Sequence, residues 1–208
     1  IAGDWMNQEG RLQVHYAYKI NAPSAATWVE KYKLNPVLDQ HQETANLANI
    51  TRAQAKPINL GISCGMQPAA LARGLGLPTI EVDSGRGYTY FKAGTEAQTI
   101  LKKYHDGVPY IQYLINYARD AMIRYGEITT IGQRKLRRRP DGKDYAAISG
   151  KIQGSAADLM YAGFKHGMDE GIDIAAIIHD EFCFEGGIRD ILKIKNILYN
   201  PHSLIFYL

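Results

Sequence analysis

Apolar residues recur along the chain with two different periods, which predict helices in the middle of the sequence and strands near both ends. The opening residues IAGDW predict a short strand that ends at Asp4. Residues 9–20 have the apolar spacing of a helix. Further helices are expected over residues 25–32, 39–48, 51–65, 69–78 and 144–170, with two more over residues 95–125 that are separated by a break near Gly107–Pro109.

Two hairpins are predicted in the second half of the chain, the first from EITTIG and RKLRR, the second from DIAAIIH and FCFEG. Residues 81–94 are rich in glycine and tyrosine and are expected to form a loop. This order of elements favours an α+β fold, in which a mostly helical insertion packs beside a small antiparallel sheet. If the first strand and the last hairpin share that sheet, Asp4 lies near Asp180.

Three ionisable residues, His179, Asp180 and Glu181, interrupt the apolar run IIHDEFCFE. Burial of unpaired charge is costly, so their presence requires a reason. One reason is the tight turn of a hairpin, where Asp is common without any function. The other is a metal or acid/base site at the hairpin tip, which needs a second carboxylate because a single Asp holds Mg²⁺ poorly. Asp4 is the candidate, since carboxylates from two strand ends can bridge two Mg²⁺ ions in phosphoryl transfer.

The helix predicted over residues 51–65 has a stripe of residues spaced by four. Arg52, Lys56, Leu60 and Cys64 form this stripe. Two cations followed by an apolar residue suit the triphosphate of a nucleotide and its sugar or base. The alternative is an ordinary solvated face of Arg and Lys.

Composition narrows the class of protein. The chain has 208 residues, of which 46% are hydrophobic and 22% charged, and a net charge of +3. These values suit a soluble globular protein and permit a nucleic-acid partner. The run RKLRRRPDGK, residues 134–143, is either a solvated loop or a contact to a phosphate backbone. Two distant cysteines, Cys64 and Cys183, indicate a reducing compartment without a disulfide framework.

No apolar run is long enough to span a membrane, and no signal peptide is recognised. The sequence starts without Met on IAGDW, which is expected of a piece of a longer protein.

Five ordered motifs resemble the DNA polymerase I family, family A. DWMNQEGRL (4–12) is similar to its first motif, with Asp4, Glu9 and Arg11 in place. RAQAKPINLGISCG (52–65) resembles the second, and IIHDEFCFE (177–185) the third, His-Asp-Glu turn. DQHQETA (39–45) is similar to the D-x-H segment, with the short spacing to Arg52 of phage-type members, and KIQGSAADLM (151–160) resembles the I-Q-G-S-A-A-D helix. Cys64 stands where the family usually has Tyr, Ser149 where Asn is common, and Met6 where Ser is usual.

The resemblance implies a role for each matching residue. Asp4 and Asp180 would bind two Mg²⁺ ions together with the backbone carbonyl of Trp5, and Glu181 would support that site. Lys56 would hold the triphosphate and could also protonate the leaving pyrophosphate. The remaining implied roles are triphosphate binding by His41 and Arg52, packing on sugar and base by Leu60, exclusion of a ribose 2′-OH by Glu9, and primer-template DNA contacts by Gln153 and His179. Arg134 and Arg137 of the basic run are further candidates for binding DNA.

The resemblance also implies the domain organisation and the partners. Residues 1–24 and 127–208 would form the palm and residues 25–126 the fingers, while a thumb and an exonuclease domain are absent from this chain. The implied activity is template-directed addition of a dNTP to a primer 3′-OH in the cytoplasm of a bacterial or phage-infected host cell.

Two other hypotheses remain. One is a catalytically incomplete, nucleic-acid-binding remnant of a polymerase, and the other is an unrelated metal-dependent phosphohydrolase, which leaves Arg52, Lys56 and the I-Q-G-S-A-A-D helix unexplained.

Overall fold

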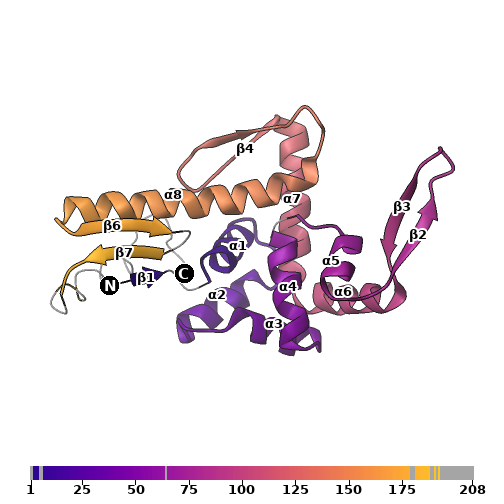
Figure 1. Ribbon diagram of the computed structural model, residues 1–208, viewed down its shortest axis with the longest axis horizontal. Coiled ribbons are helices and arrows are strands. Elements are labelled where there is room, and N and C mark those ends of the chain that lie inside the picture. The colour runs from indigo at the N-terminus through magenta and orange to yellow at the C-terminus, as the bar shows by residue number, and fades with distance from the viewer. Residues whose placement is uncertain are drawn as a thin grey trace.

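The protein combines a helical body with small antiparallel sheets at its edges (Figure 1). The computed structural model describes residues 2–4, 7–63, 65–178, 181–187, 190 and 192, and for residues 2–4 and 63 it describes the backbone alone. The helices are α1 (Gln8–Lys19), α2 (Ala25–Leu34), α3 (Gln40–Ala48), α4 (Arg52–Ser63), α5 (Pro68–Gly74), α6 (Thr95–Gly107), α7 (Pro109–Tyr125) and α8 (Ala147–Asp169), with a short 3-10 turn at Asp144–Ala146 before α8. The strands are β1 (Ala2–Asp4), β2 (Thr79–Asp83), β3 (Thr89–Ala93), β4 (Glu127–Thr129), β5 (Lys135–Arg137), β6 (Asp173–Ile178) and β7 (Glu181–Glu185). Among the helices that the structure describes, none has both the length and the apolarity needed to cross a membrane.

One sheet joins the two ends of the described chain. Its strand order is β1-β7-β6, all antiparallel, so the N-terminal strand pairs with the last hairpin as the sequence predicts. Asp4 lies opposite Glu181 in the register of β1 and β7. The last residue of β1, the last of β6 and the first of β7 therefore lie at the same end of the sheet, the end that faces α1 (Figure 1).

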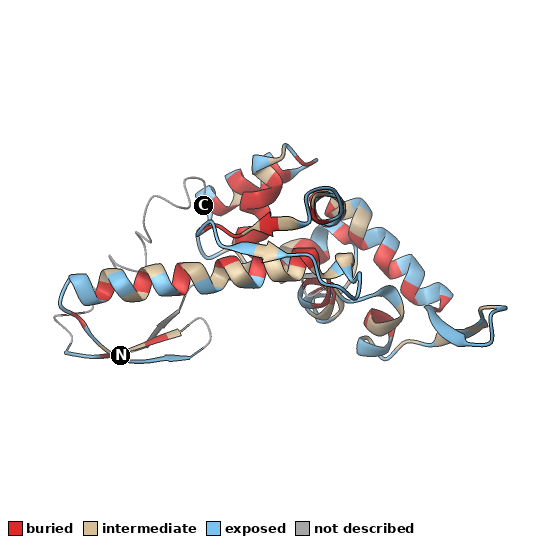
Figure 2. Ribbon diagram, turned by 90° about the horizontal axis from the view of Figure 1, so that it is seen from above, coloured by how far each residue is buried: buried red, intermediate tan, exposed pale blue. Residues whose placement is uncertain are grey.

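The long helix α8 connects the sheet to the helical body (Figure 2). Its first half contributes Ile148 and Ile152 to the main core. Near its other end, Met160 packs in a second cluster with Phe182 and Phe184 of β7. Because one continuous helix belongs to both cores, it fixes the position of the sheet relative to the helices.

Large aromatic side chains fill the main core. Trp28, Tyr32, Tyr104 and Tyr110 are all almost fully buried, and the rings of Trp28 and Tyr110 meet edge to face with centroids 5.7 Å apart. These residues come from α2, α6 and α7, so the core holds helices from distant parts of the sequence together. Burial of side chains of this size is a dominant favourable contribution to folding.

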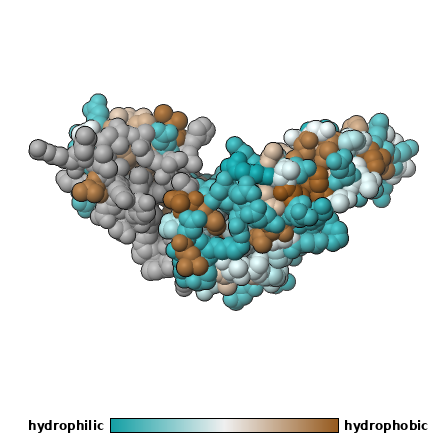
Figure 3. Space-filling view, turned by 90° about the horizontal axis from the view of Figure 1, so that it is seen from below, coloured by the Kyte–Doolittle hydropathy of each residue, from teal (hydrophilic) through white to brown (hydrophobic). Residues whose placement is uncertain are grey.

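The loop expected over residues 81–94 is wrong, because a β-hairpin occupies this region. Strands β2 and β3 pair from Thr79↔Ala93 to Asp83↔Thr89 and project from the helical body (Figure 1). The alternating, β-branched and aromatic sequences TIEVD and TYFKA favour strands, and the glycines between them form the turn. Figure 3 shows hydrophobic residues gathered at this end of the molecule, and Ile80 and Phe91 of the hairpin are about half exposed.

Candidate active site

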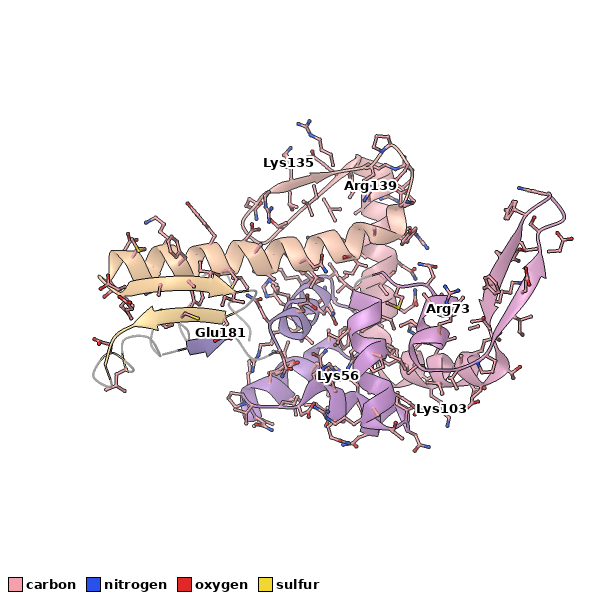
Figure 4. The ribbon with its side chains drawn as sticks, viewed as in Figure 1. Lys56, Arg73, Lys103, Lys135, Arg139 and Glu181 are labelled. Carbon is pink, nitrogen blue, oxygen red and sulfur yellow. The ribbon has the colours of Figure 1, made fainter. Side chains whose placement is uncertain are left out.

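The end of the three-stranded sheet is the first part of the site. The backbone of Asp4 pairs with that of Glu181, the residue that follows Asp180 in the chain. Glu181 lies at the end of β7 nearest the helices, and Lys56 lies within the helical body (Figure 4). The predicted ligands Trp5 and Asp180 and the predicted DNA contact His179 lie outside the described residues, as does the side chain of Asp4.

The start of α1 links this sheet end to the segment before α3. The side chain of Asn7 donates a hydrogen bond to the carbonyl of Leu38, with 2.8 Å between nitrogen and oxygen. The guanidinium of Arg11 donates to the carbonyl of Pro36. At Gly10 the two segments approach so closely that an added Cβ would lie 1.6 Å from Oε1 of Gln40. The start of α1 is therefore held against the residues around the N-terminus of α3, just before His41. Glu9, half-buried in the first turn of α1, belongs to this junction.

Asp39 and Arg52 join α3 to α4. Asp39 caps α3, because its Oδ1 accepts hydrogen bonds from the backbone N–H groups of His41 and Gln42, each at 3.0 Å. Its Oδ2 accepts from Nε of Arg52 at 2.8 Å. Partial burial acts to raise the pKa of Asp39, but the bonds from Gln42, Arg52 and His41 outweigh it, so the pKa lies below its usual value. Asp39 thus orients Arg52 and offsets part of its positive charge.

The charges of Arg52 and Lys56, the two cations predicted to bind a triphosphate, act on His41. Burial lowers its pKa most, Asp39 opposes that effect, and Arg52 and Lys56 lower the pKa further. The imidazole is therefore neutral near neutral pH. Asp39 holds Arg52 next to the first turn of α3, which carries His41, and the charge of Lys56 also acts on the imidazole.

Three members of the predicted stripe, Arg52, Lys56 and Leu60, lie on α4, which is unbroken from Arg52 to Ser63 despite Pro57. Lys56 is exposed and has no carboxylate partner among the described residues. Leu60 is 44% exposed although it is apolar. Cys64, the last member of the predicted stripe, lies outside the described residues. An unpaired cation next to an exposed apolar side chain can contact a ligand that is anionic at one end and apolar at the other.

A buried polar network supports this stripe from behind. Asn59 of α4 contacts Nδ1 of His41 at 3.0 Å and Oγ1 of Thr44 at 3.3 Å. Its Oδ1 accepts a hydrogen bond from the Tyr104 hydroxyl of α6 at 2.9 Å. The sequence analysis assigned no role to Asn59 or Tyr104, because a contact between positions 45 residues apart leaves no local pattern.

The I-Q-G-S-A-A-D helix, α8, holds the β4–β5 hairpin and α1 in place. Oγ of Ser155 lies 2.6 Å from the Tyr16 hydroxyl and accepts from the backbone N–H of Ile131 at 3.0 Å. Asp158 accepts from the N–H of Gly132 at 3.1 Å. Gln153, the predicted DNA contact, is exposed on the same helix. Ser155 and Asp158, the polar residues of the motif that bond the hairpin, therefore have a structural function.

The family model of DNA polymerase family A matches residues 36–200. The chain belongs to DNA polymerase family A. The resemblance of its motifs is thereby confirmed for most of the sequence, although the matched range begins after the first motif.

Phage polymerases are among the relatives of this family A chain. It is 31% identical over 215 residues to a DNA-directed DNA polymerase of Pseudomonas phage M6, with 88% of this chain and 32% of the relative covered. It is 36% identical over 168 residues to DNA polymerase DpoZ of Acinetobacter phage SH-Ab 15497, with 76% of this chain and 26% of the relative covered. The chain thus spans about a quarter to a third of the length of these relatives.

The fold of this family A chain is also that of a solved polymerase domain. It matches the POL domain of Pol1 from M. smegmatis, solved in complex with DNA primer-template and dNTP, with a TM-score of 0.72 and 18% sequence identity. The match covers 96% of this chain and 35% of that one. The mixture of helices and small antiparallel sheets is therefore the fold of a polymerase domain.

The basic run of the family A chain is largely compensated by its own carboxylates. Arg134 pairs with Asp158 at 2.9 Å and also donates to the carbonyl of Gly154 at 2.7 Å, which ties the hairpin to α8. The other ion pairs of the run among the described residues are Lys135–Glu127, Arg138–Asp144, Arg139–Asp141 and Lys143–Asp141. Arg137 is exposed and has no ion pair among the described residues. The local excess of positive charge is thus smaller than the sequence run suggests.

Lys151 of α8, a residue without a predicted role, contacts the β4–β5 hairpin and α1. Nζ of Lys151 donates to the carbonyl of Thr129 at 2.5 Å and lies 4.0 Å from the centroid of the Tyr16 ring. Burial, and then the charge of Lys19, lower the pKa of Lys151 to about 8. Its position next to Gln153 in the I-Q-G-S helix was visible in the sequence, but its burial was not.

Within the described ranges, no group of three or more His, Cys, Asp and Glu side chains has the arrangement to hold a metal ion. The predicted magnesium ligands are outside that search, because the side chains of Asp4 and Asp180 are not described. The backbone register alone places two carboxylate-bearing positions on neighbouring strands. Carboxylate and carbonyl oxygens are the ligands that Mg²⁺ prefers, so this set of donors fits the ion.

Proposed function

We propose that this chain carries the nucleotide-binding and catalytic parts of a template-directed DNA polymerase. The primer 3′-oxygen forms a bond to the α-phosphorus of a dNTP, the bond from that phosphorus to the bridging oxygen breaks, and pyrophosphate leaves. The 3′-OH loses its proton and the pyrophosphate gains one. Residues 1–24 and 127–208 act as the palm and residues 25–126 as the fingers.

A single observation carries this proposal. The start of α1, which follows the strand that ends at Asp4, is held against the segment that leads to His41 through Asn7, Gly10 and Arg11. The charges of Arg52 and Lys56 in turn act on His41. A candidate catalytic strand end and a candidate triphosphate site are therefore parts of one arrangement, as nucleotidyl transfer requires. A phosphohydrolase would not need the Leu60 surface or the I-Q-G-S helix.

In this proposal the cations of α4 bind the substrate. Arg52, Lys56 and the Nε2–H of His41 hold the triphosphate, and Leu60 packs on the sugar and base. Lys56 also donates a proton to the leaving pyrophosphate, where negative charge grows during the reaction. Its lack of a carboxylate partner among the described residues leaves its charge available for that purpose.

The sheet end holds the metal ions in this proposal. Asp4, Asp180 and the backbone carbonyl of Trp5 bind two Mg²⁺ ions, and Glu181 supports them. When bound, these ions stabilise the attacking and the leaving oxygen. His179 positions the primer terminus at the same hairpin tip.

The primer-template DNA lies along α8 and the β4–β5 hairpin in this proposal. Gln153 contacts the minor groove near the primer end, and Arg137 contacts phosphate. Arg134 is proposed to have two functions, because its guanidinium already ties the hairpin to α8. Removal of Arg134 therefore affects DNA binding partly through the position of the hairpin.

The function is tested by primer extension with the complete natural protein, using a defined primer-template, one matched dNTP and Mg²⁺. We expect addition of the matched nucleotide to the primer with release of pyrophosphate. The competing hypothesis of a catalytically incomplete remnant predicts a primer-template complex in a binding assay but no extension at any dNTP concentration.

Replacement of Glu9 by alanine is expected to relax the choice of sugar. Rejection of one hydroxyl requires a stiff wall near the 2′ carbon, since an apolar pocket discriminates such a group poorly. Glu9 is half-buried at the junction between the sheet end and α3, where a wall of this kind is needed. Single-turnover incorporation of matched rNTP and dNTP should show the rNTP/dNTP ratio rising by at least about tenfold, the order of a lost packing contact.

The matched control is Glu96→Ala. Glu96 occupies the first turn of α6 as Glu9 occupies that of α1, so both changes remove a favourable carboxylate from a helix N-terminus. Glu96→Ala should lower stability slightly and leave sugar choice unchanged. If Glu9→Ala does only the same, Glu9 is a helix-capping residue and not a gate.

A further inference from the structure

Asn59 makes a contact that can decide which ring nitrogen of His41 carries the proton. It lies on α4 three residues after Lys56 and is 6% exposed. The Tyr104 hydroxyl donates to its Oδ1, so its Nδ2 is the group that faces His41 and Thr44. Thr44 and Tyr104 are themselves fully or almost fully buried. The amide is therefore held on both sides by hydrogen-bond partners in a buried position.

The orientation of the Asn59 amide decides which nitrogen of His41 carries the proton. Nδ2 can only donate, so Nδ1 of His41, 3.0 Å away, must accept. A neutral imidazole that accepts at Nδ1 carries its proton on Nε2. His41 is half-buried, with one ring nitrogen bound to the interior of the protein.

We propose that Asn59, clamped by Tyr104, is a positioning residue that fixes the ring and tautomer of His41 and so presents its Nε2–H to the triphosphate. The inference rests on the proposed function, because it assumes that His41 contacts the nucleotide. It extends that function by a chain of hydrogen bonds that runs from the buried Tyr104 of α6 through Asn59 of α4 to His41 of α3. The burial that lowers the pKa of His41 supports it, since only a neutral ring can accept at Nδ1.

The tautomer is tested directly by ¹⁵N NMR of the histidine-labelled complete protein, with the His41 signal assigned by its loss in His41→Gln. We expect the wild type to show the Nε2–H tautomer near neutral pH. Asn59→Asp replaces the donor by a carboxylate oxygen while it keeps the acceptor for Tyr104, and should move a proton to Nδ1. A wild-type ring protonated at Nδ1 would overturn the proposal.

The effect on substrate is tested by a double-mutant cycle. Asn59→Leu has a similar shape and removes the hydrogen bonds, and we expect the KM for dNTP to rise about fivefold to tenfold, the effect of one lost hydrogen bond or slightly more. Tyr104→Phe should act in the same direction but more weakly. Neither change should have a further effect in a His41→Gln background. An equal loss in that background would show that Asn59 does not act through His41 and would overturn the proposal.

The matched control is Tyr32→Phe, which removes another buried phenol hydroxyl. Tyr32 lies on α2, whereas Asn59 lies on α4 and Tyr104 on α6. Tyr32→Phe should change stability without changing the KM for dNTP or the His41 signal. If His41→Gln leaves dNTP binding unchanged, the substrate role of His41 in the proposed function fails. The NMR result still tests whether Asn59 fixes the tautomer of His41.

Discussion

Replacement of Asp180 by asparagine is expected to reduce nucleotide incorporation by about a thousandfold or more, since a metal-binding carboxylate contributes several kcal/mol to such a reaction. The change keeps the shape of the side chain and removes its charge. Affinity for duplex DNA should change little, because it comes mainly from contacts between cations and phosphates. Single-turnover primer extension and a DNA-binding titration of the complete protein measure the two quantities separately.

The control for this change is Asp106→Asn, which removes an exposed carboxylate that pairs with Lys102 on α6. It should leave incorporation unchanged, since exposed ion pairs contribute little. If Asp180→Asn retains more than about a tenth of the wild-type rate, the magnesium site must be assigned to other residues.

Local patterns in the sequence predict most of the helices and the strands of the β1-β7-β6 sheet. The apolar spacing of residues 9–20 and the alternation around IIHDEFCFE correspond to α1 and to the β6–β7 hairpin. The antiparallel pairing of β1 with β7 followed from an assumption about topology, and the register confirms it. These predictions succeed because amphipathic periodicity reports directly which face of an element is buried.

Contacts between distant residues are what the sequence could not predict. The hydrogen bond from Tyr104 to Asn59 and the ion pair of Asp39 with Arg52 depend on how helices pack, which no local pattern encodes. The hairpin at residues 79–93 was missed for a different reason. Its two strands alternate properly, but the glycines and tyrosines around residue 88 suggested a loop, although glycine is also required at a tight hairpin turn.

The charges around α4 indicate that Lys56 matters more than Arg52. Asp39 offsets part of the charge of Arg52, and His41 is neutral near neutral pH. Lys56 has no such partner among the described residues and lies on the exposed side of the helix. The positive charge available to a triphosphate and to a leaving pyrophosphate therefore comes mainly from Lys56.

Replacement of Lys56 by alanine should accordingly raise the Kd for dNTP and slow the chemical step, with a combined loss of about a hundredfold to a thousandfold in the efficiency of incorporation. Arg52→Ala should raise the Kd for dNTP with a smaller effect on the chemical step, because its guanidinium is held by Asp39 at the edge of the site. Pre-steady-state incorporation at varied dNTP concentration measures the Kd for dNTP and the rate of the chemical step separately. Lys103→Ala, which removes an exposed lysine of α6 (Figure 4), is the matched control and should change neither. A Lys56→Ala protein that loses DNA affinity but keeps wild-type dNTP kinetics would place α4 against the duplex and not against the nucleotide.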